Sequence, residues 1–584
     1  MDSQVAAHRL NEIALLLEVR GENPFKSRAF TQAARTIGEL EEEDIAPKVR
    51  SKEISKLPGI GATTFAVLAD LVETGESAYL QSLRESTPAG LIEMLRIPGL
   101  GPTRIHRLHE GLRIESVTDL EAAIKDGRIA KLSGFGVKTA DKILKGIATL
   151  RETSGQLMHT VAYPEAGRLQ RAIARLDGVR QADIAGSLRR IAEVVRDIDL
   201  VVTCSGDPAD VVKAVGKVPG VEEVAKGEGD AVRLTMVGGL QANLRCVGSD
   251  EFPVAFWRAT GSAEHCEAVI NRLGDRGFSI RNDRLVDARG KAIEADEETI
   301  YMNAGLAFIP VELRENRGEN DASLSGSLPD LIQLDDLRGV LHCHSKYSDG
   351  STTIAEMADT ARARGWSYLG ISDHSQAASY AGGLDRDAVL RQHDEIDALN
   401  QGVKGFRVLK GIEADILADG TVDYGDDLLD RFDYVVGSIH SRFGMGQAEM
   451  TERILKAMSD PRLTIIGHPT GRLLLRREPF AVDMDAIMEM AAEKGIALEL
   501  NCDPNRLDLD WRWLQLARQR GITIEVGPDA HSPAELSFVD FGIQIARKGW
   551  LEKANVLNTR NATDVLKFAR TRRDAGSRKA TRGA

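Results

Sequence analysis

Residues 340–349 read VLHCHSKYSD, an apolar run that ends in His342 and His344 and reaches Asp349 five residues later. Successive side chains of a strand point to opposite faces, so the two imidazoles share one face and Cys343 points to the other. Two neighbouring neutral imidazoles can hold one cation. This stretch therefore predicts a β-strand whose carboxyl end carries metal ligands.

Six further apolar runs follow, and they alternate with amphipathic helical segments. They are YLGISDH at 368–374, RVLKGIE at 407–413, YVVGSIH at 434–440, LTIIGHP at 463–469, IALELNC at 496–502 and ITIEVGPDAH at 522–531. Seven repeats of strand and helix are typical of a parallel α/β barrel. Such barrels carry their chemistry at the carboxyl ends of the strands.

Metal-binding residue types stand at these strand ends, among them six of the twelve histidines of the chain. The candidate ligands are His342, His344, Asp349, His374, Glu413, His440, His468, Asp529 and His531. Any one of them alone is more often a satisfied core or surface residue, but nine at one rim favour a shared site. Carboxylates can bridge cations about 3.5 to 4 Å apart, and imidazole with carboxylate suits Mn, Zn or Fe. Such a cluster activates water, which predicts phosphoester hydrolysis.

The same residues lie in recognisable motifs: HxHxxxxD at 342–349, SDH at 372–374, GxE at 411–413, SxH at 438–440, GHP at 467–469 and DAH at 529–531. Over residues 337–570 the chain resembles the PHP (polymerase and histidinol phosphatase) family. The resemblance implies a distorted (β/α)7 barrel in which the nine residues bind three divalent metals (Mn²⁺, Zn²⁺ or Fe²⁺), with His344 required for catalysis. Val340 and Pro528 depart from the family pattern without removing a ligand. Arg442 and Arg472 follow strand ends and are candidates for binding substrate phosphate, the alternative being plain solvated charges.

The bulk properties describe a multidomain protein, because 584 residues exceed the roughly 250 to 300 at which a single core stops growing. Five scattered cysteines form no CxxC pair, which argues against disulfides and thiolate zinc sites. No apolar run reaches the ~18 residues of a membrane span, and the first residues lack a signal-peptide layout. We therefore expect a cytoplasmic monomer without membrane contact. The net charge of −13 does not prevent a local basic track from binding nucleic acid.

Three glycine-containing turns, at 57–61, 97–101 and 132–136, each lead into a helix within the first 150 residues. They resemble the helix-hairpin-helix motif, whose backbone amides contact DNA phosphates without reading bases. The resemblance implies DNA contacts at Gly59, Gly61, Gly99, Gly101, Gly134 and Gly136. A single turn of this kind is more often a mere helix connection, whereas three favour DNA binding.

Two aspartates, Asp197 and Asp199, lie two residues apart in a strand-like run and can both hold Mg²⁺ or Mn²⁺. Together with GSLRR at 186–190, TGS at 260–262, EETIY at 297–301 and ENPFKSRAF at 22–30, they resemble a family X DNA polymerase. The resemblance implies that Ser187, Arg190 and Gly261 bind the incoming dNTP.

The resemblance fails at the third catalytic aspartate, where this chain has Asn243. An amide carries no negative charge and cannot accept the primer hydroxyl proton. Further departures fall at Arg258, Ala259, Cys266 and Ile270, and Val67 stands where related lyases have a Schiff-base lysine. We expect polymerisation to be absent or weakened and lyase activity to be absent, while nucleotide binding remains possible.

These features predict a multidomain fold with N-terminal helical helix-hairpin-helix domains, an α+β nucleotidyltransferase palm and thumb, and a C-terminal distorted (β/α)7 PHP barrel. The predicted boundaries are 1–80 for a polymerase-β-like helical domain, 81–150 for helix-hairpin-helix fingers, 151–250 for the palm, 251–315 for the thumb, 316–336 for a polar linker, 337–570 for the PHP domain and 571–584 for a basic tail. The tail is expected to be a disordered end, with DNA contact as the alternative.

The leading interpretation is a DNA-repair enzyme of the bacterial polymerase X type, acting in base excision repair on gapped or 3′-ended DNA. Its PHP domain is expected to be a metal-dependent 3′→5′ exonuclease or 3′-phosphatase. The alternatives are an active gap-filling DNA polymerase with 3′→5′ exonuclease, a non-catalytic DNA-binding scaffold, and a small-molecule phosphatase.

Overall fold

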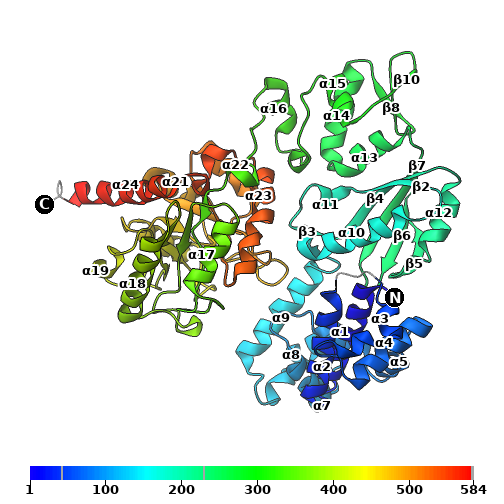
Figure 1. Cartoon of the computed structure of the whole chain (residues 1–584), viewed down its shortest axis with the longest axis horizontal. Helices are drawn as coiled ribbons and strands as arrows, with labels where there is room; N and C mark the ends of the chain where they lie inside the picture. The colour runs from blue at the N-terminus through cyan, green and yellow to red at the C-terminus, as the bar shows by residue number, and fades with distance from the viewer. Residues whose placement is uncertain (41–43, 228–230, 581–584) are drawn as a thin grey trace.

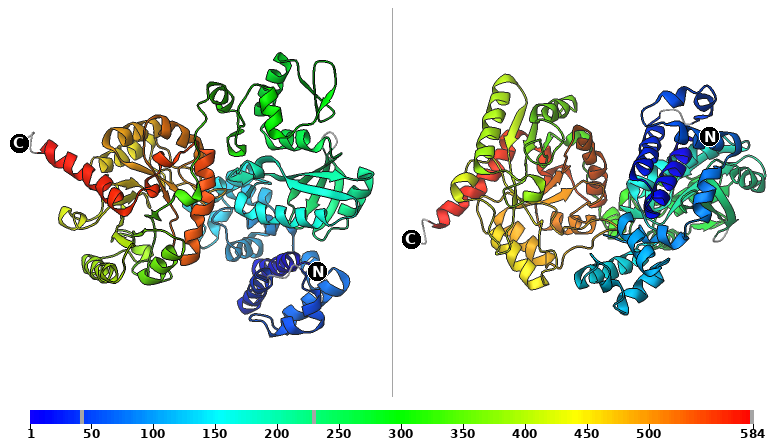
Figure 2. Two further views of the ribbon diagram at one scale, coloured as in Figure 1. Left: turned by 45° about the horizontal axis from the view of Figure 1, so that its top comes forward. Right: turned by 90° about the horizontal axis from the view of Figure 1, so that it is seen from below.

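The computed structural model describes residues 1–40, 44–227 and 231–580, which form two lobes (Figures 1 and 2). One lobe holds the helical amino-terminal part and a mixed β-sheet. The other holds the carboxy-terminal strands and helices, coloured yellow-green to red. Among the described residues, no helix is both long and apolar enough to cross a membrane.

The first 150 residues are helical, as the sequence predicts, and they enclose two separate apolar cores. In the first helix, Leu10, Ile13 and Leu17 recur at helical spacing and are fully buried. The helices are α1 (Ser3–Val19), α2 (Pro24–Gly38), α3 (Ala46–Arg50), α4 (Ala62–Thr74), α5 (Ala78–Glu85), α6 (Ala89–Met94), α7 (Pro102–Leu112), α8 (Val117–Lys125) and α9 (Val137–Glu152).

A five-stranded mixed sheet follows, in the order β2-β4-β7-β6-β5. Its strands are β2 (Val179–Ile184), β4 (Asp197–Cys204), β5 (Val221–Lys226), β6 (Val232–Met236) and β7 (Gln241–Val247); the neighbouring elements are β1 (Leu157–Met158), α10 (His159–Ala174), α11 (Gly186–Arg189), β3 (Val194–Val195) and α12 (Pro208–Val215). Strands β4 and β7 are parallel, and their register sets Asp199 opposite Asn243. The two residues therefore lie on the same face of the sheet.

A smaller unit follows the sheet. It consists of α13 (Phe252–Thr260), α14 (Ala263–Asp275), β8 (Ser279–Arg281), β9 (Arg284–Val286), β10 (Ala292–Ile293), α15 (Glu297–Asn303) and α16 (Glu319–Ser325). Helix α16 falls within the segment 316–336 that the sequence suggested as a polar linker. Its Glu319 is fully buried, with Oε1 2.6 Å from His265 Nδ1. The polar side chains of this segment thus have partners inside the fold, so it is not a free spacer.

All seven apolar runs that begin at residue 340 contain a strand. The strands are β11 (Gly339–Val340), β12 (Tyr368–Ile371), β13 (Arg407–Lys410), β14 (Glu413–Asp415), β15 (Val436–Ser438), β16 (Ile465–Ile466), β17 (Ala497–Asn501) and β18 (Ile524–Gly527). The third run is divided at Gly411, where a Cβ atom would lie 2.2 Å from the Tyr434 ring. Parallel pairing gives two ladders, β11-β12-β13 and β14-β15-β16-β17-β18.

Two isolated bridges, His374 with Glu413 and Cys343 with Ala530, connect the ladders at both edges. Helices surround the strands and bury one large apolar core between them (Figure 1). They are α17 (Ile354–Ala363), α18 (Arg386–Gly402), α19 (Asp426–Leu429), α20 (Gln447–Met458), α21 (Met484–Lys494), α22 (Trp511–Gln519), α23 (Phe538–Lys548) and α24 (Ala562–Ala580).

Helix α24 corrects the expectation of a disordered tail from residue 571. The helix continues to Ala580, and Arg572 is only 7% exposed. Its guanidinium donates to the carbonyl oxygens of Met458 and Lys494, at 2.7 and 3.1 Å. The basic composition was misleading because this arginine caps carbonyl groups of its own domain. Residues 581–584 lie outside the described part of the chain.

The two lobes meet where α22 packs against the loop that precedes β3 and α23 packs against the start of α10. Glu193 in this loop accepts hydrogen bonds from Trp511 Nε1 at 2.9 Å and from Arg512 Nη1 at 2.7 Å. The rings of His159 and Phe541 stack at 4.7 Å beside it. These contacts join residues more than 300 positions apart and hold the carboxylate-bearing sheet against the carboxy-terminal domain.

Candidate metal centre

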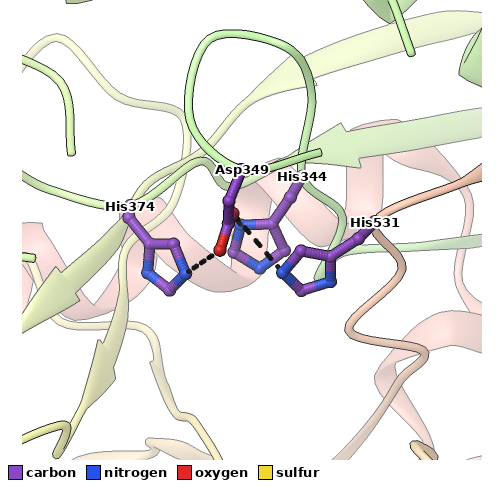
Figure 3. A group of neighbouring side chains, drawn as sticks. All are labelled: His344, Asp349, His374 and His531. Carbon is purple, nitrogen blue, oxygen red and sulfur yellow. Dashed lines mark ion pairs between the residues drawn. The ribbon is translucent and has the colours of Figure 1, made fainter. Parts of the chain in front are cut away.

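The nine residues predicted as ligands converge at one mouth of the carboxy-terminal domain. Figure 3 shows four of them, His344, Asp349, His374 and His531, with side chains that point toward one another. The two Asp349 oxygens lie 3.5 Å from His374 Nε2 and 3.4 Å from His531 Nε2. One possible ligand atom from each of the four lies within 4.8 Å of the others, which is close enough to share a cation.

Two more groups share members with the first. In one, Asp529 Oδ1 lies 3.5 Å from His342 Nε2 and 3.2 Å from His344 Nε2. The Cys343 side chain packs in the apolar core, so the alternation expected of the HxH pair is confirmed.

The third group is centred on Glu413, a fully buried carboxylate. Glu413 lies 2.8 Å from His374 Nδ1, 3.2 Å from His440 Nε2 and 3.0 Å from His468 Nε2. His344 and His374 each belong to two groups, which together contain eight of the nine residues. His468 joins the same network through Glu413.

The chemistry of these donors fits divalent cations. Within the described residues, buried nitrogens such as His342 Nε2 and both ring nitrogens of His344 form no hydrogen bond. Buried polar atoms without partners are costly, and a cation would satisfy them. Burial, and then the charge of His374, lower the pKa of His344 to about 3, which keeps this imidazole neutral as a ligand must be.

Two of the nine residues have strained backbones. His468 has φ 27° and Asp529 has φ 52°, both in the left-handed region that is unfavourable for residues with a side chain. Strain of this kind is typical of functional sites, where the surrounding structure imposes it. In this site it turns the ends of β16 and β18 toward the common mouth.

Strands β14 and β17 contribute residues that the sequence analysis missed. Glu499 lies 2.5 Å from His342 Nδ1, and Asn501 Nδ2 donates to Asp529 Oδ2 at 3.0 Å. Asp415 lies 2.7 Å from His440 Nδ1 in the same way. A signal existed in the run IALELNC, because a glutamate inside a buried strand requires a partner. These residues orient the ligands and do not belong to the nine.

Glu499→Gln is therefore expected to weaken metal binding by about 10- to 100-fold, the usual effect of losing a carboxylate that orients a ligating histidine. Isothermal titration with Mn²⁺ measures the change. Glu493→Gln is the matched control, because Glu493 is an exposed glutamate on the neighbouring helix α21. Equal affinities of the Glu499→Gln and wild-type proteins would contradict the role of Glu499.

The arginine that approaches the cluster is Arg506, which our sequence analysis also missed. Its Nε lies 3.6 Å from Asp529 Oδ2.

Arg472, predicted to bind substrate phosphate, is instead 7% exposed and donates to Asp510 and to the carbonyl oxygens of Arg506 and Leu507. The structure corrects that prediction, because the donors of Arg472 are used within the protein. Arg442 stays exposed after β15, and its role stays a prediction.

Metal loading is expected to release protons. Burial alone would lower the pKa of His374, but Glu413 and Asp349 outweigh it and raise this pKa to about 10. Carboxylates likewise overcome burial at His440 and His531 and raise both pKa values to about 9. The neighbouring carboxylates, Glu499 first, also outweigh burial at His342 and raise its pKa well above the usual value. With these four histidines protonated at pH 7, metal binding should release up to about four protons, and release from His374, His440 and His531 should fade as the pH rises through 9 to 10. Titration in buffers of different ionisation enthalpy measures the number, and a constant zero would contradict the expectation.

The second candidate site lies on the sheet of the other lobe. Asn243 Nδ2 donates to Asp197 Oδ2 at 2.9 Å and to Asp199 Oδ1 at 3.0 Å, beside a cavity of about 270 Å³. Burial, and then the charge of Asp197, raise the pKa of Asp199 to about 6. The amide thus occupies the position next to both carboxylates where a third carboxylate would complete a metal site.

Of the three residues expected to bind a nucleotide, Arg190 already has hydrogen-bond partners within the protein. Arg190 donates to Glu315 Oε1 at 2.9 Å and to the carbonyl oxygen of Thr260 at 2.8 Å. Lys548 of the other lobe, with a fully buried side chain, donates to Glu315 Oε1 at 2.5 Å and to the Arg190 carbonyl oxygen at 2.8 Å. Ser187 lies on α11, and Gly261 ends α13. Arg190 is therefore part of the contact between the lobes.

The three glycine turns share one geometry. Gly59, Gly99 and Gly134 have φ values of 82°, 80° and 86°, which favour glycine, and Gly61, Gly101 and Gly136 are the N-caps of α4, α7 and α9. All six are exposed. A cavity of about 750 Å³ separates the second turn from residues 474–476 of the carboxy-terminal lobe, on the loop that follows His468.

Comparison with known families agrees with this two-part architecture. Residues 1–77 match the helix-hairpin-helix domain, residues 91–149 match the SAM-like helix-hairpin-helix tandem, and residues 341–503 match the PHP domain. Asp529 and His531 lie beyond the matched PHP residues, and the structure joins them to the site. The fold and the site thus define a protein with helix-hairpin-helix domains and a carboxy-terminal PHP domain.

Individual relatives extend the match to the whole chain. The DNA polymerase/3′-5′ exonuclease PolX of Bacillus subtilis is 35% identical over 563 residues, which cover 96% of this chain and 98% of the relative. A probable phosphatase of Syntrophotalea carbinolica is 32% identical over 28% of this chain and 64% of its own length, and one of Caldicellulosiruptor saccharolyticus is 25% identical over 34% and 82%. The chain belongs to the bacterial PolX family, the family X DNA polymerases with a PHP domain.

Proposed function

We propose that this protein is a DNA-repair nuclease whose PHP domain removes nucleotides from 3′ ends in the 3′→5′ direction. The observation that carries the proposal is the convergence of nine ligand-type side chains, several with buried unpaired nitrogens, at a single mouth. This arrangement argues against a non-catalytic scaffold, in which such a cluster would have no purpose.

The nine residues would hold three divalent cations, Mn²⁺, Zn²⁺ or Fe²⁺, one in each group of donors. Bound cations would polarise the scissile phosphate and lower the pKa of a water molecule toward neutrality. His344 would hold two of the groups together, while Glu499 and Asp415 fix the orientation of their histidines. Arg506 would neutralise charge on a phosphate oxygen.

The finer architecture belongs to the same proposal. The strands from β11 to β18 would form a distorted (β/α)7 barrel over residues 337–570, the sheet a nucleotidyltransferase palm over 151–250, and the following unit a thumb over 251–315. The segments 1–80 and 81–150 would be two helix-hairpin-helix units.

DNA is the substrate that the helical part favours. The exposed turns present backbone amides at helix N-termini, which are suited to phosphates of any sequence. The second turn and residues 474–476, on the loop after His468, line the same cavity of about 750 Å³, so DNA held at this turn would also meet the carboxy-terminal lobe. The printed name of the Bacillus subtilis relative includes a 3′-5′ exonuclease, in agreement with this proposal.

Polymerisation is proposed to be weak or absent, because Asn243 cannot accept a proton and adds no charge to a metal site. The second candidate function is a working gap-filling polymerase. It is favoured by Asp197 and Asp199, which remain on one face of β4 beside a cavity. Nucleotide addition to a gapped primer-template separates the two.

The test of the nuclease uses full-length protein, DNA labelled at its 5′ end, and Mn²⁺, Mg²⁺ or Zn²⁺ in separate reactions. We expect a ladder of products shortened from the 3′ end with at least one metal, on both gapped and single-stranded DNA. A circular single strand serves as the control for endonuclease activity. Intact linear DNA under all conditions, or cleavage of the circle at the same rate, would overturn the proposal.

A further inference from the structure

An exposed aromatic side chain, Tyr380, stands beside the metal cluster. It lies on a short helical turn, η5 (Ser379–Ala381), within the loop that leads from His374 to α18. Its side chain is 70% exposed, whereas Ala378 and Ala381 on the same turn are buried. A tyrosine usually covers much of its ring in a folded protein, whereas this one leaves most of a flat aromatic surface open to solvent.

The loop that carries Tyr380 is tightly built. The Leu384 amide donates to the His374 carbonyl oxygen at 2.9 Å, which closes the base of the loop, and the Gly383 amide donates to the Ala378 carbonyl oxygen at 3.2 Å. A Cβ atom at Gly383 would lie 1.9 Å from the Ser375 carbonyl oxygen, so the loop crosses itself in close contact. The position of the Tyr380 ring is therefore set by the backbone.

This position is next to the ligands of the proposed site. The Tyr380 ring centroid lies 6.1 Å from that of His374 and 6.3 Å from that of His440. The cluster is otherwise accessible at Asp349 and His531, whose side chains are each 35% exposed. If a substrate phosphate lies at the cluster, the flat ring of Tyr380 is close enough to be reached by the base of the same nucleotide. In a nucleotide the base is one sugar away from the phosphate, which matches this distance between surface and cluster.

We propose that Tyr380 forms a nucleobase subsite, in which its ring stacks on the base of the 3′-terminal nucleotide while the adjacent phosphodiester lies at the metal cluster. The inference rests on the proposed nuclease function and assigns its substrate class. Stacking on an aromatic ring tolerates every base, because each base has a π-face. The subsite therefore selects nucleic-acid ends over small phosphate esters without selecting a sequence.

The experiment compares two oligonucleotides that differ only in the terminal base. One ends in an ordinary nucleotide, and the other ends in an abasic analogue with the same sugar and phosphodiester. The full-length wild type, Tyr380→Ala and Tyr380→Phe are assayed for kcat/KM with Mn²⁺. We expect the wild type to prefer the base by about 5- to 100-fold, the range expected from stacking of one base. Tyr380→Ala should lower this preference to near one, and Tyr380→Phe should restore it.

A second readout separates stacking from damage to the metal centre. Cleavage of the abasic oligonucleotide, which has no terminal base to stack, should have the same kcat/KM in Tyr380→Ala and wild type, and the Mn²⁺ affinity should also be the same. A wild type without base preference, or a preference retained in Tyr380→Ala, overturns the subsite while leaving the nuclease in place. Failure of the wild type to cleave either oligonucleotide overturns the nuclease and the subsite together.

Discussion

Replacing His344 with alanine is expected to lower the rate of DNA hydrolysis by about 1000-fold or more. Losing a residue that only orients a metal ligand costs about 10- to 100-fold, and His344 is itself a donor in two of the three groups. Its removal takes away the donor that the group of Asp349 and the group of Asp529 have in common. Single-turnover cleavage of 5′-labelled DNA, with metal content measured on the same sample, gives the size of the loss.

The matched control for this variant is His393→Leu. His393 is a buried histidine of the same domain, but its ring packs against Phe432 at 4.9 Å and lies outside the nine. This substitution should leave the metal content and the cleavage rate within a few-fold of wild type. A His344→Ala protein that keeps its metal and cleaves like His393→Leu would show that the cluster is not the catalytic centre.

Asn243→Asp is expected to raise nucleotide addition on a gapped primer-template by about 100-fold or more, the typical contribution of a positioned general base. The new carboxylate replaces an amide that now donates to both Asp197 and Asp199. Three carboxylates without a cation would repel one another, so the variant should also gain affinity for Mg²⁺. Extension of a labelled primer, titrated with Mg²⁺, measures both changes.

Asn243→Leu has the same size and no charge, so it controls for the loss of the amide. It should show no gain in nucleotide addition. Strong extension by the wild type would contradict the proposal that polymerisation is weakened. Equal gains in the aspartate and leucine variants would contradict the role assigned to the carboxylate.

The sequence predicted the strands of the carboxy-terminal domain and the convergence of its nine candidate ligands, for a local reason. A ligand such as His374 or Glu413 directly follows an apolar run, and the end of a parallel strand has a known place in a barrel. The positions of the nine residues at the ends of predicted strands were therefore enough to predict that they converge. Glu499 was missed because it lies inside a strand and contacts His342, a partner 157 residues away.

Side chains with long-range partners explain the other errors. Arg472 and Arg572 looked like free charges in the sequence, yet both donate to carbonyl groups of distant segments. The contact of Glu193 with Trp511 could not be predicted either, because the local sequence around each residue does not indicate the other as its partner. A sequence pattern of this kind indicates which face of an element is buried, but not which segment buries it.

Arg190, Glu315 and Lys548 connect the proposed nucleotide site to the contact between the lobes. A triphosphate that drew the Arg190 guanidinium away from Glu315 would leave this carboxylate with the buried ammonium of the opposite lobe as its remaining cation. In that case, nucleotide binding at the proposed palm would weaken the contact between the lobes. Reciprocity requires that whatever tightens that junction weakens nucleotide affinity by the same factor.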